Sequence, residues 1–158
     1  MSPRAAWRLE GLGFEKVFDY VPGKADWFAS GLPREGKLAS VPTIGEVVWR
    51  DVPTCAPAEK IRVARDRKMG LDRCVVVNKE RVVLGLLRER ELASNPEAPV
   101  EEVMRNGPTT FRPNEPVGKM RKGMLARGAS AVLVTTSDGR LVGLLYVKDT
   151  EHPDGVQT

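Results

Sequence analysis

The chain has 158 residues, of which 41% are apolar and 29% carry a charge. These proportions are typical of a folded globular protein and exclude wholesale disorder. A chain of this length can bury the core of one domain or of two small, closely packed ones. No apolar run approaches the roughly 18 residues of a membrane span, and the first residues lack the apolar core of a secretory signal. We therefore expect a cytoplasmic protein with no membrane partner.

The residues that usually hold metals or carry out acid–base catalysis are scarce. The cysteines are Cys55 and Cys74, without the CxxC spacing of a zinc site, and the one histidine is His152, in the polar tail 151–158. We expect both cysteines to be small buried residues. Composition therefore predicts no metal site and no catalytic residues, and no constellation typical of an enzyme appears elsewhere.

Lys and Arg number 25 against 21 acidic residues, so the formal net charge is +4. That excess suits a small phosphorylated ligand as well as nucleic acid. The charges alternate in sign, and the few aromatic residues are not interleaved with basic ones as a single-strand stacking platform requires. The sequence thus disfavours nucleic acid as a partner. This alternative gains support only if four basic residues form one patch: Arg62, Arg65, Lys119 and Lys122.

Residues 1–40 are predicted to form a short α/β extension. We expect a helix at Ala5–Leu12, a strand at Lys16–Tyr20 and a helix at Ala25–Ser30, which a Gly-Leu-Pro sequence ends. A linker of mixed glycine, proline and charge then covers Pro33–Val41.

Part of this extension resembles the closing segment of a rhodanese-like sulfurtransferase domain. The residues concerned are Leu9-Glu10-Gly11-Leu12-Gly13-Phe14-Glu15-Lys16-Val17, followed by Gly23, Trp27 and Gly31-Leu32-Pro33. The loop that carries the rhodanese cysteine has no counterpart beside them, so we do not expect sulfur transfer. The alternative is an extension whose large aromatic side chains pack onto the rest of the module or a dimer partner. These side chains are Trp7, Phe18, Trp27 and Phe28.

A unit of about 55 residues occurs twice, at 43–92 and at 99–150. Gly85-Leu86-Leu87 recurs 58 residues later as Gly143-Leu144-Leu145, whereas Thr54 and Thr110 are 56 residues apart. The change in spacing predicts two additional residues in the long helix of the second copy.

Each unit shows the same order of expected elements. A short helix opens with a capping box at Thr43 and runs through Trp49; a brief extended segment with a threonine follows, and then a longer amphipathic helix. The apolar face of that helix is predicted to consist of Ile61, Ala64 and Met69 in the first copy and of Val117, Met120, Met124 and Leu125 in the second.

Two strands in a hairpin and a final helix complete each unit. The expected strands are Cys74–Val77 and Val82–Leu87, then Val132–Thr135 and Leu141–Leu145. Asp138-Gly139 is a good hairpin turn, and the final helices begin near Arg88 and Tyr146.

This ordered repetition resembles a tandem pair of CBS domains, a Bateman module, across residues 43–150. Its marks are Asp51-Val52-Pro53-Thr54 and Gly107-Pro108-Thr109-Thr110 before the two helices, together with the two glycine-containing strands. The resemblance implies an α/β (α+β) fold of two β-α-β-β-α repeats with pseudo-twofold symmetry. It further implies a regulatory role rather than an enzymatic one, a homodimer, and an effector protein that the sequence does not identify.

The resemblance also implies an adenosine-type small molecule as ligand: AMP, ADP, ATP or S-adenosylmethionine, with no required cofactor. In the family a carboxylate holds the ribose hydroxyls at the end of a G-h-x-[S/T]-x-x-D motif. Asp149 keeps that position, although Tyr146 replaces the hydroxyl residue; in the first copy Glu91 and Arg88 take the two positions. The other interpretations are that Asp149 caps the final helix and that Glu91 lies on the surface.

Two clefts between the repeats are therefore predicted to bind ligand. The one that the sequence favours, because it keeps Asp149, joins Thr54, Cys55, Ala56, Asp72, Arg73, Leu144, Tyr146 and Asp149. The second and weaker one joins Thr110, Phe111, Ser130, Arg73, Leu86, Arg88 and Glu91. The resemblance places Arg73 and Arg88 where a phosphate would be held, unless Arg88 blocks its cleft. The alternative functions are a ligand-free structural or protein-interaction module and a weak nucleic-acid binder.

Overall fold

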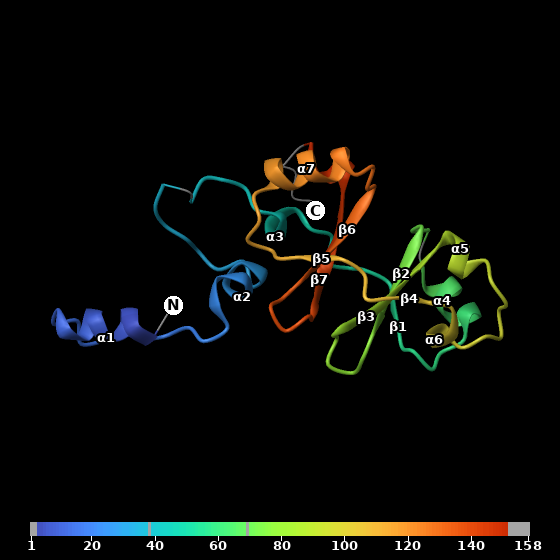
Figure 1. Ribbon diagram of the computed structural model, residues 1–158, viewed down its shortest axis with the longest axis horizontal. Helices are drawn as coiled ribbons and strands as arrows, with labels where there is room; N and C mark the ends of the chain where they lie inside the picture. Colours follow the sequence, from blue (N-terminus) through green and yellow to red (C-terminus); the bar gives the residue numbers. More distant parts are fainter. Residues whose placement is uncertain (1–2, 38, 69, 152–158) are drawn as a thin grey trace.

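The computed structural model describes residues 3–37, 39–68 and 70–151, and it contains two small sheets with helices packed on them (Figure 1). The extension and first repeat contain α1 (Pro3–Gly11), α2 (Gly23–Ala29), α3 (Ile44–Val47), β1 (Thr54–Cys55), α4 (Ile61–Arg67), β2 (Arg73–Val77), β3 (Val83–Arg88) and α5 (Glu89–Leu92). The second repeat contains α6 (Val100–Val103), β4 (Arg105–Asn106), β5 (Thr110–Phe111), α7 (Val117–Ala126), β6 (Ala131–Thr135), β7 (Leu141–Tyr146) and the 3-10 helix η1 (Val147–Thr150). The predicted fold class is confirmed.

Both sheets have the same internal topology. The first has the strand order β1-β2-β3-β4 and the second β5-β6-β7. In each, the two-residue strand with the threonine pairs in parallel with the next strand, which then forms an antiparallel hairpin. The long helix of the second repeat has ten residues and that of the first has seven, in keeping with the change in repeat spacing.

The segment that leads into each repeat crosses to the sheet of the other repeat. Trp49 forms an antiparallel bridge with Leu144 of β7, and Arg105 of β4 pairs with Leu86 of β3. The short helix α3 accordingly packs into the core of the second repeat and α6 into that of the first. The predicted helix from Thr43 through Trp49 ends at Val47, because the chain must extend there to reach β7.

Two glycines make this crossing feasible. A Cβ atom on Gly143 would overlap the carbonyl oxygen of Trp49, and one on Gly85 would lie 2.5 Å from the sulfur of Met104. The repeated glycine in the two strands therefore marks the place where the backbone of the other repeat approaches most closely.

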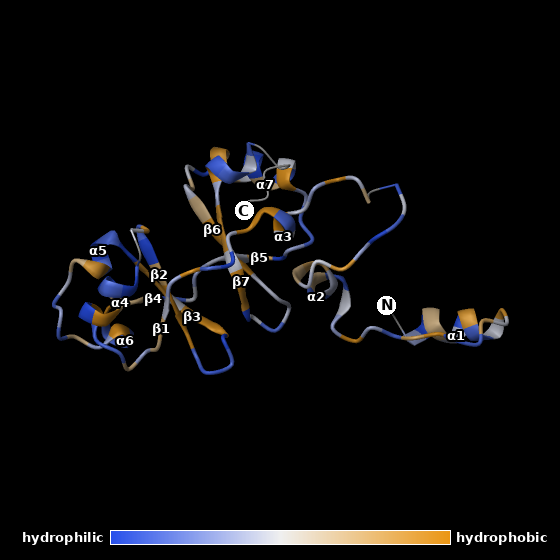
Figure 2. Ribbon diagram, turned by 180° about the vertical axis from the view of Figure 1, so that it is seen from behind, coloured by the Kyte–Doolittle hydropathy of each residue, from blue (hydrophilic) through white to orange (hydrophobic). Residues whose placement is uncertain are grey.

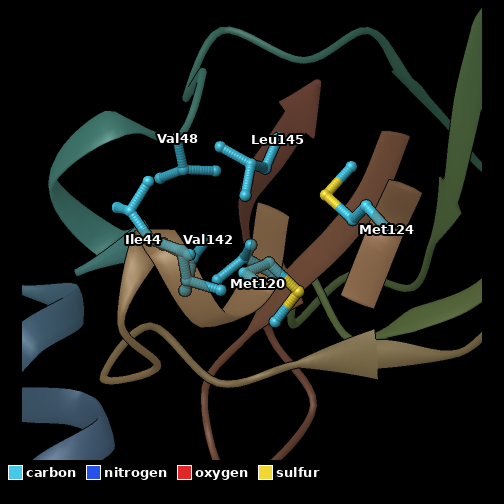
Figure 3. Close-up of a cluster of buried hydrophobic side chains, with 8 residues drawn as sticks. Ile44, Val48, Met120, Met124, Val142 and Leu145 are labelled. Atoms are coloured by element: carbon cyan, nitrogen blue, oxygen red, sulfur yellow. The ribbon is translucent and has the colours of Figure 1, made fainter. Parts of the chain in front are cut away.

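Three clusters of apolar side chains form the core. The first lies under α7 and includes Ile44 and Val48 from α3 and its C-terminal flank (Figure 3). The second lies under α4 and contains both cysteines, which are buried as expected. The third joins the inner faces of the two sheets, and its buried members are Val52, Val75, Val77, Leu86, Leu133, Leu141 and Leu144.

The amphipathic helices agree with their predicted faces with one exception. Val117, Met120 and Met124 are buried, whereas Leu125 is 56% exposed. Leu125 follows Met124 directly, and a step of one residue turns the side chain by about a quarter of the helix circumference, away from the core. Met69, which the sequence placed on the face of the first helix, lies outside the described residues, as does His152.

The two hairpin turns meet each other. The backbone N–H of Val83 donates to the carbonyl of Gly139 over 3.0 Å, and that of Leu141 donates to the carbonyl of Arg81 over 2.9 Å. Gly139 has φ +85° and Arg81 has φ 62°, so the predicted Asp138-Gly139 turn has an equivalent that uses arginine in the left-handed region.

The extension consists of helices only in the part of the chain that the structure describes. The predicted strand at Lys16–Tyr20 is wrong, since this segment pairs with neither sheet and a strand needs a neighbour to bond its backbone groups. Helix α1 has no buried residue and lies away from the sheets although it carries apolar positions (Figure 2).

The prediction that aromatic residues of the extension pack onto the module is correct in part. Trp7 is 73% exposed and Phe18 is 80% exposed, so neither packs onto the repeats. Trp27 and Phe28 are half-buried on α2, which lies beside α3 (Figure 1).

Candidate functional site

A cavity of about 660 Å³ lies between the repeats. Strands β2 to β4 contribute one wall, and β5, β6, β7 and α7 contribute the rest. The cavity is lined by Arg73, Leu86, Arg88, Arg105, Asn106, Gly107, Pro108, Thr109, Phe111, Glu115, Lys119, Met120, Gly123, Met124, Arg127, Ala129, Ala131, Val132, Leu133 and Leu144. Because both repeats supply this lining, a bound molecule would contact both.

The deep part of the cavity is apolar. Met120 and Met124 project from α7 and belong both to the cavity wall and to the core cluster under that helix (Figure 3). Phe111 and Leu133 add further apolar surface. Methionine side chains adapt their shape to an irregular partner, so this surface can accept a flat ring.

The rim of the cavity is strongly basic. Five of the lining residues are cations and one, Glu115, is an acid. Three of the cations are held by carboxylates: Lys119 by Glu115 at 3.1 Å, Arg105 by Glu91 at 3.0 Å, and Arg73 by its neighbour Asp72. Arg88 and Arg127 complete the set.

The two acids at the predicted ribose positions close capping boxes at the N-termini of α5 and η1, so the interpretation that Asp149 caps the final helix is confirmed. A carboxylate oxygen of Glu91 accepts a bond from the N–H of Arg88 over 3.0 Å, and Asp149 accepts one from Tyr146 over 3.3 Å. Burial by itself would raise the pKa of Glu91. The hydrogen bonds from the Arg88 backbone N–H and from the Arg105 guanidinium outweigh burial and hold that pKa below its ordinary value. Glu91 is 9% exposed, so the interpretation as a surface residue is wrong.

The weaker of the two predicted clefts coincides with the cavity. Of its seven residues, the structure brings Phe111, Arg73, Leu86 and Arg88 to the cavity wall. The other three, Thr110, Ser130 and Glu91, lie next to it in the chain or in contact with a lining residue. Neighbouring residues of a strand point to opposite faces, which explains why Thr109 and Phe111 line the cavity while Thr110 does not.

Three residues of the cleft that the sequence favours, Asp72, Arg73 and Tyr146, contact one another. The hydroxyl of Tyr146 donates to Asp72 over 3.1 Å, and the Arg73 guanidinium lies 5.5 Å above the Tyr146 ring. Arg73 also donates to the hydroxyl of Ser130 over 3.1 Å. Burial and the negative charge of Asp72 raise the pKa of Tyr146 to about 12.

Three of the remaining residues of that cleft lie on β1 or directly after it. Thr54 is half-buried on β1, Cys55 beside it is 2% exposed, and the backbone N–H of Ala56 donates to Glu59 over 3.0 Å. A hydrogen bond with Cys74 and burial raise the pKa of the Cys55 thiol, which keeps it protonated and unreactive. Leu144 belongs to the apolar cluster between the two sheets and lines the cavity.

Sequence reasoning missed three of the cations at the cavity: Arg105, Lys119 and Arg127. Lys119 and Arg127 were visible as basic residues on and after the second long helix. Arg105 reaches the cavity only because its segment crosses to β3, and the repeat pattern alone does not reveal that crossing.

Other kinds of site find no support among the described residues. No three His, Cys, Asp or Glu side chains there gather closely enough to hold a metal ion. Nor does that part of the chain contain a helix with the length and apolarity needed to cross a bilayer. Of the four basic residues that a nucleic-acid patch would need, Arg65 donates to the carbonyls of Leu92 and Ser94.

Comparison with known proteins identifies the repeats. A model of the CBS domain matches residues 44–97 and 100–149. The chain is 26% identical over 117 residues to the "Uncharacterized protein MK0525" of Methanopyrus kandleri. That match covers 68% of this chain and 60% of the relative, so the chain spans less than two thirds of the curated protein it matches.

Solved structures share the fold at low sequence identity. The CBS domain pair of protein MJ0100, in complex with 5′-methylthioadenosine and S-adenosyl-L-methionine, has a TM-score of 0.60 at 19% identity; the match covers 71% of this chain and 94% of that one. The cytosolic domain of the Mg²⁺ channel MgtE in complex with ATP has a TM-score of 0.61 at 20% identity, and the match covers 72% of this chain and 50% of that one. A putative acetoin utilization protein of Vibrio cholerae has a TM-score of 0.61 at 21% identity, and the match covers 69% of this chain and 87% of that one. Since the CBS model matches two stretches that make up more than half of it, the chain belongs to the CBS domain family.

Proposed function

We propose that the chain is a regulatory module that binds an adenosine-containing molecule in the cavity beside Phe111. The observation that carries the proposal is the 660 Å³ cavity between the repeats, apolar inside and basic at its rim. A volume of this size is typical of small-molecule sites, which combine apolar walls with a few polar groups. The adenine ring would lie against Met120, Met124 and Leu133, and the acidic end of the ligand would face the cations.

Binding of a ligand in this cavity would affect both repeats. Both repeats line the cavity, and the crossing segment at Arg105 forms part of its wall. A ligand that prefers one arrangement of the repeats shifts the population towards it. The module would pass this change to an effector protein or through a homodimer, and we propose no catalytic role.

The solved relatives support an adenosine-type ligand. The MJ0100 pair was solved with two adenosine-containing compounds and the MgtE domain with ATP. The cleft around Thr54 and Asp149 remains a proposal for a second site, and a ligand there would have to displace the Tyr146 hydroxyl from Asp72.

Thermal unfolding of the chain with a panel of nucleosides and nucleotides tests this function. The panel contains AMP, ADP, ATP, S-adenosylmethionine and 5′-methylthioadenosine, with the guanosine counterparts of the first three as controls. A ligand that binds only the folded state stabilises it by about 2.7 kcal/mol at a hundredfold excess over its Kd. We expect an adenosine compound to raise the melting temperature more than its guanosine counterpart. If none does at millimolar concentration, the module is a ligand-free structural or interaction unit instead.

A further inference from the structure

The charges around the cavity do not cancel. Its lining includes five cations, the buried Arg73 and the exposed Arg88, Arg105, Lys119 and Arg127. Three carboxylates, from Asp72, Glu91 and Glu115, pair with three of them. The cavity and its immediate partners thus have a surplus of two positive charges. A concave site with walls of low polarizability concentrates such a field on whatever enters it.

Two arginine side chains account for this surplus of positive charge. Arg88 stands at the end of β3, and Arg127 follows the last residue of α7. Both are exposed, and within residues 3–37, 39–68 and 70–151 neither has a carboxylate within ion-pair distance. The three paired cations are held in place by their acids, whereas these two guanidinium groups are available to a ligand.

From this arrangement we propose that the ligand is an adenosine di- or triphosphate whose phosphates bridge Arg88 of the first repeat and Arg127 of the second. The inference rests on the proposed function and makes its ligand class specific. Guanidinium groups bind phosphate oxygens through two parallel hydrogen bonds, and a chain of two or three phosphates has enough oxygens to engage both arginines.

The same charges disfavour S-adenosylmethionine. That molecule carries a sulfonium and an ammonium cation against one carboxylate, so its net charge has the same sign as that of the cavity. Like charges brought together out of water repel each other. AMP, with a single phosphate, would satisfy one of the two arginines and would bind between adenosine and ADP in affinity.

A polyphosphate held in this way would also link the two repeats. Arg88 is part of the first sheet and Arg127 belongs to the second repeat, so the phosphates would add a connection across the cavity to the backbone pairing of the crossing segments. The number of phosphates would then determine how firmly the repeats are held together.

Isothermal titration calorimetry of the full chain tests the proposal with adenosine, AMP, ADP, ATP, S-adenosylmethionine and inorganic tripolyphosphate. We expect affinity to rise from adenosine through AMP to ADP and ATP, and S-adenosylmethionine to bind no better than adenosine. Arg88→Ala and Arg127→Ala should each weaken ATP binding about tenfold or more and leave adenosine binding within about twofold.

Two exposed basic residues outside the cavity provide matched controls. Arg90 on α5 lies two residues from Arg88, and Lys122 lies on α7; Arg90→Ala and Lys122→Ala should leave ATP affinity within about twofold of the unaltered chain. If these controls weaken ATP binding as much as the cavity variants do, the attraction is general and the bridge is overturned.

The ligand series separates this inference from the proposed function. If adenosine and ATP bind equally well, or S-adenosylmethionine binds most tightly, the polyphosphate inference fails while the adenosine site stands. If tripolyphosphate binds and adenosine adds nothing to its affinity, the polyanion site stands and the adenosine function fails. If no compound binds, both are overturned.

Discussion

Trp49 and Leu144 exchange both of their backbone hydrogen bonds, each over 2.9 Å. One residue precedes the first repeat's threonine strand and the other lies in the last strand of the second repeat, 95 positions later in the chain. The pairing of Arg105 with Leu86 is the equivalent contact in the other direction. Each repeat therefore depends on the other to complete its sheet and core, and the two should fold as one cooperative unit.

The glycines beside these contacts should differ in their tolerance of a methyl group. In Gly143→Ala the new Cβ meets the backbone oxygen of Trp49, which cannot move without breaking the crossing pair. In Gly85→Ala it meets chiefly the flexible Met104 side chain, and the nearest backbone atom, the oxygen of Arg105, is 3.1 Å away. We expect Gly143→Ala to lower the free energy of unfolding by about 3 kcal/mol and Gly85→Ala by about 1 kcal/mol. Denaturant titration measures both, and equal losses would contradict this explanation.

The periodicity of the sequence predicted the repeated elements because each depends on local pattern: a capping box before α3, an apolar stripe on α7 and a turn at Gly139. It did not predict that α3 packs into the second repeat's core, because both cores are equally apolar. The predicted strand of the extension failed for the related reason that β pairing needs a partner, which a local pattern does not supply.

At the candidate site, too, the sequence predicted local features but not contacts between distant residues. The sequence placed Phe111, Leu86 and Arg88 in one predicted cleft, and all three line the cavity. It favoured the other cleft because Asp149 keeps the family's acid, but the conformation of Tyr146 depends on Asp72, 74 residues away. A side-chain contact over that separation cannot be deduced from residue type and spacing.

Two glycines of α7 allow the cavity to be filled selectively. Gly123 lines it and Gly118 does not, and a Cβ at either position meets no atom within 4 Å. Glycine is the poorest helix former after proline, so Gly123→Leu and Gly118→Leu should both remain folded. We expect Gly123→Leu to abolish the rise in melting temperature that ATP causes and Gly118→Leu to preserve it. Preservation in both variants would place the ligand elsewhere.

The Glu91 carboxylate should contribute stability that depends on pH. Its pKa is lower in the folded chain than its ordinary value of 4.5, so its contribution is complete above that pH. The contribution is lost as the pH falls through the lower, folded-state value. Glu91→Gln should reduce the free energy of unfolding at neutral pH by about 1–3 kcal/mol and reduce the further loss on acidification.

Glu89→Gln is the matched control, because Glu89 is exposed on the same short helix. Denaturant titrations at several pH values should show the steep acid-side decline in the control and in the unaltered chain, and a flatter one in Glu91→Gln. Parallel curves for all three would mean that the contacts with Arg88 and Arg105 do not influence stability.

The two helices of the extension should contribute unequally to stability. Helix α1 buries no residue, whereas α2 places Ala29 against the core cluster under α7. Just beyond α2, Arg34 forms an ion pair with Glu46 of α3 at 2.7 Å and lies 5.2 Å from the centre of the Phe28 ring.

Removal of residues 1–15 should therefore change the free energy of unfolding by less than about 0.5 kcal/mol. Removal of residues 1–36 uncovers the cluster and breaks the ion pair, so it should cost about 1–3 kcal/mol. Denaturant titration compares the two truncations with the full chain. A large loss from the shorter truncation would show that Trp7 and Leu12 are covered in solution. Analytical ultracentrifugation would then show whether a second copy of the chain covers them, because the homodimer would dissociate when residues 1–15 are removed.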